Sequence, residues 1–134
     1  MAYFKDLTSY TYSLHILRQY EKQIPTEGLV NVGWLDPATA PFETGPMLLG
    51  LTEKLERLCR DRGIIPYMGD HDCPMCPHTR DRPMCNREIF VPNPDGPGGF
   101  MCPELIGHYV RVHQYLPPEV FIRSLILSVM ERNP

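Results

Sequence analysis

The residues best suited to chemistry are two cysteines separated by two positions, Cys73 and Cys76, near the middle of the chain. In a turn, two thiolates spaced in this way can bind one metal ion at about 2.3 Å, while backbone amides of the loop donate to the sulfurs. Two histidines, His108 and His113, follow in a segment that favours a helix. Together the four residues match a Cys2His2 ligand set and predict a structural zinc site.

The spacing of the two histidines leaves the ligand set open. Each residue of a regular helix turns the chain by about 100°, so positions five apart differ by about 140°. His108 and His113 would therefore converge only if the helix tightens or bulges between them. His71, two residues before the first cysteine, is an alternative ligand, and Cys85 and Cys102 offer a second alternative, a four-cysteine site.

Other chemistries use the same residue types. A C-x-x-C pair can be a redox dithiol, but that role requires the motif to open a helix, which Pro74 and Pro77 disfavour. An iron–sulfur cluster would need Cys73 and Cys76 together with Cys85 and Cys102. A small zinc-dependent hydrolase would use Glu104, Asp70 or Asp72 as a general base beside an open metal position. Because two thiolates neutralise the charge of the ion, we expect instead a closed site without hydrolytic turnover.

Patterns that mark common enzyme classes are absent from the sequence. It contains no H-E-x-x-H, no G-x-S-x-G and no phosphate-binding glycine loop. No histidine is followed two residues later by glutamate, as zinc deaminases require. We therefore expect a binding or adaptor module with a structural zinc ion and another protein as its partner. A redox or metal sensor acting through Cys73 and Cys76 is the remaining alternative.

Composition indicates one globular domain, residues 1–134, with 43% hydrophobic and 22% charged residues. A net charge of −3 disfavours nucleic acid as the main partner. The first residues do not resemble a signal peptide, and no apolar run is long enough to span a membrane. Five cysteines in a chain without an export signal disfavour a disulfide framework. We therefore expect a cytoplasmic protein with reduced thiols.

The elements expected around these residues make an α+β domain. Runs of β-branched and apolar residues predict a small antiparallel sheet from strands at 29–35, 64–67 and 88–91. The strongest helix prediction is 46–62, which has an apolar stripe, Pro46 in its first turn and Gly63 at its end. Further helices are expected at about 13–23, 103–115 and 118–131. Zinc would join a metal loop at about 69–87 to the 103–115 helix.

Four motifs are similar to those of a family of small uncharacterised bacterial proteins. They are Y-F-K-D-L at 3–7, G-W-L at 33–35, H-x-C-x-x-C at 71–76 and H-Y-x-x-x-H-x-Y-x-P-P at 108–118. The resemblance runs nearly end to end and implies that His71 belongs to one site with the two cysteines and the two later histidines. It does not require Cys85 or Cys102. It also implies that the Pro/Gly segment Asn93–Gly99 is a variable insertion.

Overall fold

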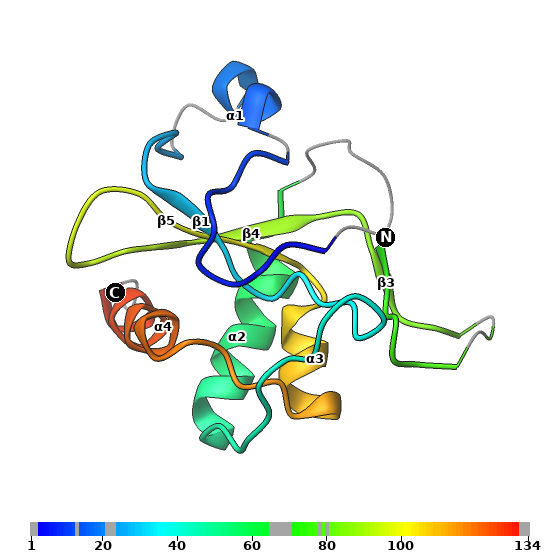
Figure 1. Cartoon of the computed structure of the whole chain (residues 1–134). Helices are drawn as coiled ribbons and strands as arrows, with labels where there is room; N and C mark the ends of the chain where they lie inside the picture. Colours follow the sequence, from blue (N-terminus) through cyan, green and yellow to red (C-terminus); the bar gives the residue numbers. More distant parts are fainter. Residues whose placement is uncertain are drawn as a thin grey trace.

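Figure 1 shows a computed structural model of the chain, which describes residues 3–12, 14–20, 24–64, 71–77, 79 and 81–131. Its helices are α1 (Leu14–Tyr20), α2 (Leu49–Asp61), α3 (Ile106–His113) and α4 (Glu119–Glu131). Its strands are β1 (Leu29–Asn31), β2 (His71–Asp72), β3 (Met84–Cys85), β4 (Glu88–Pro92) and β5 (Gly99–Pro103). The mixture of helices with small sheets confirms the α+β class. Within these ranges, no helix is long and apolar enough to cross a membrane.

The larger sheet has the order β1-β5-β4, and the smaller one consists of β2 and β3. Strands β4 and β5 are antiparallel, but β1 runs parallel to β5. The expectation of a wholly antiparallel sheet was therefore wrong. The error arose because β5 was not predicted at all. All five of its residues are buried, so it lacks the polar–apolar alternation by which a half-exposed strand is recognised.

Both faces of the larger sheet are covered, which explains the burial of β5. Phe100 and Cys102 pack on one side with residues of α2, α3 and α4, whereas Met101 packs on the other side with Leu17 of α1 and Trp34. This alternation follows the two-residue period of a strand. In Figure 1, α1 lies on one side of the sheet and the other three helices lie on the opposite side.

The predicted strand at 29–35 is shorter in the structure because the chain turns at Gly33. Its φ of +86° is a left-handed conformation that ends extended pairing, and β1 therefore stops at Asn31. The strand at 88–91 is confirmed as β4. Of the predicted strand at 64–67, Ile64 forms a single bridge with Glu88, and residues 65–67 lie outside the described ranges.

Helix α2 begins three residues later than its apolar stripe predicts. The preceding segment is held extended, because Thr44 bridges Tyr115 and the Gly45 N–H donates to the Gln114 carbonyl at 2.9 Å. Pro46 therefore precedes the helix instead of opening it. In the same way, α3 begins at Ile106 and not at Pro103, because Pro103 is the last residue of β5 and pairs with Glu88.

Candidate metal centre

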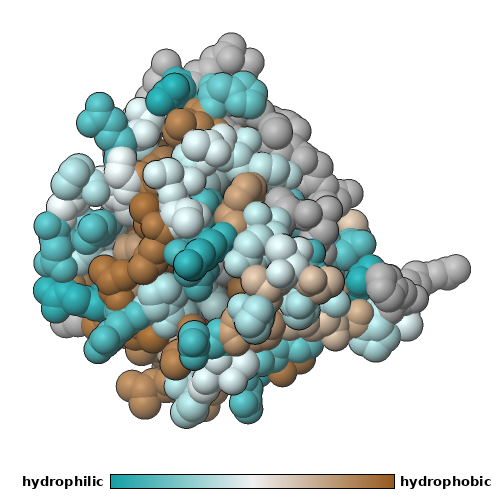
Figure 2. Space-filling view, viewed as in Figure 1, coloured by the Kyte–Doolittle hydropathy of each residue, from teal (hydrophilic) through white to brown (hydrophobic). Residues whose placement is uncertain are grey.

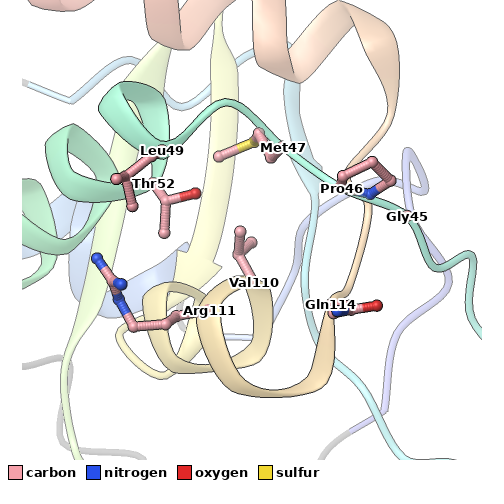
Figure 3. Close-up of a pocket in the computed structure, with 8 residues that line it drawn as sticks. All are labelled: Gly45, Pro46, Met47, Leu49, Thr52, Val110, Arg111 and Gln114. Carbon is pink, nitrogen blue, oxygen red and sulfur yellow. The ribbon is translucent and has the colours of Figure 1, made fainter.

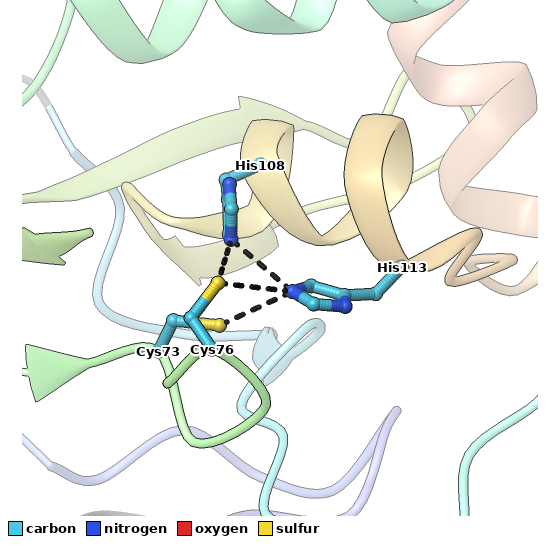
Figure 4. A group of neighbouring side chains, drawn as sticks. All are labelled: Cys73, Cys76, His108 and His113. Atoms are coloured by element: carbon cyan, nitrogen blue, oxygen red, sulfur yellow. Dashed lines mark hydrogen bonds between the residues drawn. The ribbon is translucent and has the colours of Figure 1, made fainter. Parts of the chain in front are cut away.

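Two cysteines and two histidines converge in the structure. The sulfurs of Cys73 and Cys76 and one ring nitrogen each of His108 and His113 all lie within 4.8 Å of one another. The Nε2 of His113 is 3.4 Å from the Cys73 sulfur and 3.5 Å from the Cys76 sulfur, and the Nε2 of His108 is 3.3 Å from the Cys76 sulfur. The two Nε2 atoms are 3.2 Å apart. Figure 4 shows both imidazoles reaching from α3 toward the cysteine loop.

These distances fit a tetrahedral metal ion. With zinc–sulfur bonds of about 2.3 Å and zinc–nitrogen bonds of about 2.0–2.1 Å, an ideal tetrahedron separates sulfur from nitrogen by about 3.6 Å and nitrogen from nitrogen by about 3.3 Å. The sulfur–nitrogen distances of 3.3 to 3.5 Å and the nitrogen–nitrogen distance of 3.2 Å differ from these values by a few tenths of an ångström. The four residues could therefore hold a metal ion with protein atoms in all four positions.

The cysteines are positioned by the β2–β3 hairpin. Its strands pair His71 with Cys85, and the Cys73 N–H then donates to the Pro83 carbonyl at 2.9 Å. Cys73 is fully buried, and this burial raises the pKa of its thiol. The backbone N–H groups of Met75 and Cys76 donate to the same sulfur and oppose that shift. Such backbone donors are the usual surroundings of a thiolate ligand.

Both histidines lie on α3, and His113 is its last residue, directly before a wide turn. Gln114 adopts a left-handed conformation with φ of 55°, and its N–H donates to the Tyr109 carbonyl. The Tyr115 N–H donates to the same carbonyl at 3.1 Å. These bonds span five and six positions, compared with four in a regular helix. The helix is continuous from Ile106 to His113, and the wide turn follows His113 directly.

The histidines also have suitable protonation behaviour. Burial lowers the pKa of His108, and the neighbouring His113 lowers it further. Burial likewise lowers the pKa of His113. Both effects favour the neutral imidazole, which is the form that binds metals.

His71 does not join this group of four. Its ring is buried and lies against the aromatic rings of Trp34, at a centroid distance of 5.4 Å, and Tyr12, at 5.7 Å. His71 thus precedes Cys73 in the hairpin and packs among aromatic side chains. The structure brings together four of the five residues that the sequence suggested as ligands.

The four-cysteine alternative does not form in the described part of the chain, because neither Cys85 nor Cys102 joins the group. Both thiols are buried. Burial raises the pKa of Cys85 to about 11, and its sulfur accepts backbone N–H groups including that of Leu105. These two cysteines are core residues.

The carboxylates proposed as a general base are engaged elsewhere. Glu104 forms an ion pair with Arg87, and the Asp72 carboxylate lies 3.5 Å from the Arg82 guanidinium. Asp70 lies outside the described residues. Neither of the two described carboxylates belongs to the metal-binding group.

The sequence did not reveal the structural role of the two arginines that follow the cysteine loop. The Arg82 Nε donates to the Cys73 carbonyl at 3.0 Å and so fixes the loop from inside the hairpin. Arg87 donates to the Cys59 carbonyl at 3.0 Å, in the last turn of α2. Because arginine side chains also bind phosphates and carboxylates at protein surfaces, their presence in the sequence does not predict these internal hydrogen bonds.

A hollow of about 220 Å³ lies between the start of α2 and the end of α3. Figure 3 shows Met47, Leu49 and Thr52 on one side, with Val110, Arg111 and Gln114 on the other. The neighbouring leucines are prominently exposed, Leu48 by 75% and Leu49 by 62%. In Figure 2, apolar side chains reach the surface at the lower edge of the molecule, where α2 begins in Figure 1.

The sequence was also compared with known protein families. Residues 2–126 match the family described as Domain of unknown function (DUF7919). The chain belongs to this family. The matched range includes all four metal-binding candidates and three of the four helices in full. No curated protein and no solved structure matches the chain.

Proposed function

We propose that this protein is a zinc-binding adaptor module in which one structural zinc ion joins the β2–β3 hairpin to α3. The observation that carries the proposal is the near-tetrahedral arrangement of two sulfurs and two Nε2 atoms. Zinc is the metal that best suits two thiolates and two imidazoles in this geometry. Magnesium and calcium prefer oxygen ligands and do not suit this set.

A structural role fits the site better than a hydrolytic one. Four protein ligands complete a tetrahedron and leave no position for a reacting water. Two thiolates also reduce the positive charge that would activate such a water. Glu104, the base of the alternative hydrolase, is paired with Arg87. These points favour an ion that maintains the fold of its surroundings.

We propose that the partner is another protein, which binds where α2 begins and α3 ends. Support comes from exposed Leu48 and Leu49 beside a hollow that can receive an apolar side chain. One wall of the hollow belongs to α3, so the zinc ion would hold that wall in place. The net charge of −3 disfavours nucleic acid. We place the module in the cytoplasm, where cysteine ligands stay reduced.

Metal analysis of protein purified without chelators tests the zinc site. We expect close to one zinc ion per chain, and loss of that zinc in Cys76→Ser and His108→Ala. Cys85→Ala is the matched control, because this buried cysteine lies outside the group of four. Metal-free wild-type protein, or zinc loss from Cys85→Ala alone, would refute the assignment. Iron in place of zinc would refute the choice of metal.

A photo-crosslinking residue at position 48 tests the protein partner. Position 27, where Glu27 is exposed in the loop before β1, serves as the control. We expect a discrete crosslinked protein from position 48 but not from 27, and its loss on Leu49→Ser and on zinc removal. Equal crosslinking from both positions, or crosslinking that is insensitive to Leu49→Ser, contradicts a partner at this surface.

A further inference from the structure

A partly buried hydrogen bond joins the first and the last motif of the chain. The hydroxyl of Tyr115 donates to Oδ2 of Asp6 at 2.6 Å, across 109 positions of sequence. The other oxygen of Asp6 accepts the Gly33 N–H at 3.0 Å. The Tyr115 side chain is fully buried. Asp6 therefore ties Tyr115 to the turn that follows β1.

Asp6 is itself held in place by the segment around it. The Leu7 N–H donates to the Asn31 carbonyl at 2.7 Å, and the Asn31 N–H donates to the Thr8 carbonyl at 2.8 Å. The N-terminal arm thus lies along β1, and Asp6 projects from a backbone that is bonded on its C-terminal side. A carboxylate fixed in this way can hold the tyrosine in one position.

Tyr115 is part of the wide turn that ends α3. Its N–H closes that turn on the Tyr109 carbonyl, and it follows His113 by two positions. His113 is the last residue of α3, so helical residues flank it only on its N-terminal side. Cys73 and Cys76, by contrast, are held by their own hairpin. The placement of His113 therefore depends most on the turn.

We infer that Asp6 and Tyr115 are positioning residues of the metal centre, which hold the wide turn so that His113 presents its Nε2 to the ion. The inference rests on the zinc site proposed above. Neither residue touches the ion, and their effect passes through the backbone between positions 113 and 115. Loosening this turn would leave Cys73, Cys76 and His108 in place and weaken the bond between His113 and the ion.

A second tyrosine–carboxylate bond, this one buried, provides a control. The hydroxyl of Tyr10 donates to Oε1 of Glu88, also at 2.6 Å, and both residues are buried. This bond joins the N-terminal arm to β4 and does not involve the end of α3. Tyr10→Phe therefore removes the same kind of bond as Tyr115→Phe without touching the turn at His113.

The test compares the zinc affinity of full-length variants by competition with a chromophoric chelator, together with visible spectra of the cobalt-substituted protein. We expect Tyr115→Phe to bind zinc about tenfold more weakly, the order of effect seen when residues that orient metal ligands are removed. Its cobalt absorption bands should shift because one imidazole is loosened. Asp6→Asn retains one acceptor oxygen and should fall between wild type and Tyr115→Phe.

Tyr10→Phe should lower the melting temperature but leave zinc affinity within about twofold of wild type, because the ligand geometry is unchanged. Wild-type affinity and an unchanged cobalt spectrum in Tyr115→Phe would overturn the inference and leave the zinc site standing. An equal loss of affinity in Tyr10→Phe would overturn it too, because the effect would then be general. Wild-type protein without metal would refute the zinc site itself. If Tyr115→Phe does not fold, Asp6→Asn decides by the same measurements.

Discussion

The Nε2 atoms of His108 and His113 lie 3.2 Å apart, although the two residues are five positions apart in the chain. In a regular helix their side chains would point about 140° apart. Helix α3 is nevertheless continuous through both residues, and the wide turn at Gln114 follows His113 directly. The imidazole rings therefore reach toward one another and toward the two cysteines (Figure 4), and several measurements can test the site that these four side chains form.

Chelation of the metal should loosen the cysteine hairpin and the end of α3 while α2 stays folded. The reason is that the proposed zinc ion would be a single cross-link, whereas Leu55 of α2 lies in the main hydrophobic cluster with Phe121 and Leu125 of α4. We expect faster hydrogen exchange in residues 71–77 and 81–85 and a lower melting temperature. Global loss of protection, including α2, would show that the metal is required for the whole fold.

His71→Phe should retain close to one zinc ion per chain, whereas His108→Phe should lose it. Phenylalanine can keep the ring contacts that His71 makes with Trp34 and Tyr12 but offers no nitrogen to a metal. The identical substitution at His108 removes a ligand. Elemental analysis and a chelator competition measure both variants. Zinc loss from a folded His71→Phe protein would return His71 to the ligand set.

Stability should decrease at alkaline pH because buried thiols resist ionisation. Burial raises the pKa of Cys59 to about 12 and that of Cys85 to about 11. In the unfolded chain these thiols lose their protons near pH 9, so above this pH the folded state binds more protons. Each thiol therefore contributes full stability below about pH 9, and this contribution is lost as pH rises toward the folded pKa.

Urea unfolding of wild type and Cys59→Ala between pH 8 and 10.5 measures this effect. In the upper part of the range, each thiol should lower the free energy of unfolding by about 1.4 kcal/mol per pH unit. Cys59→Ala should show a correspondingly shallower slope, together with a lower stability at pH 8 from the lost packing. Identical slopes in the two proteins would contradict the assignment of this dependence to Cys59.

Gly33→Ala should destabilise the protein by about 2 kcal/mol or more. Gly33 has φ of +86°, and an added Cβ would lie 2.8 Å from Cδ1 of Ile106, the first residue of α3. Gly50→Ala is the control, because no atom lies within 4 Å of its added Cβ. In the first turn of α2 it should raise stability by up to about 1 kcal/mol. Thermal unfolding of both variants checks the opposite signs.

The ligand types could be read from the sequence because their spacing reflects coordination chemistry. Cys73 and Cys76 are separated as a metal loop requires, and the two histidines were recognised with them. From the sequence, convergence of the histidines was expected only if the helix tightened or bulged between them. The structure has a continuous helix from Ile106 to His113, and the left-handed residue Gln114 follows both histidines.

The sheet was harder to predict because its central strand is buried on both faces. Gly99–Pro103 has neither an alternation of polar and apolar residues nor a run of β-branched residues. Only its packing in the folded protein identifies it as β5. The parallel pairing of β1 with β5 also depends on chain topology and not on local residues. His71 resembled a ligand by position, and only the surrounding aromatic rings reveal its packing role.

The four candidate ligands are also separated in time during synthesis of the chain. His113 follows Cys73 by 40 positions, so at translation rates of about 5–20 residues per second it is added about 2–8 s later. A nascent chain that has reached the cysteine hairpin can offer an ion only two thiolates. Coordination of the proposed zinc ion by all four residues would therefore be a late event of biogenesis, and until then both sulfurs would depend on the reducing power of the surrounding solution.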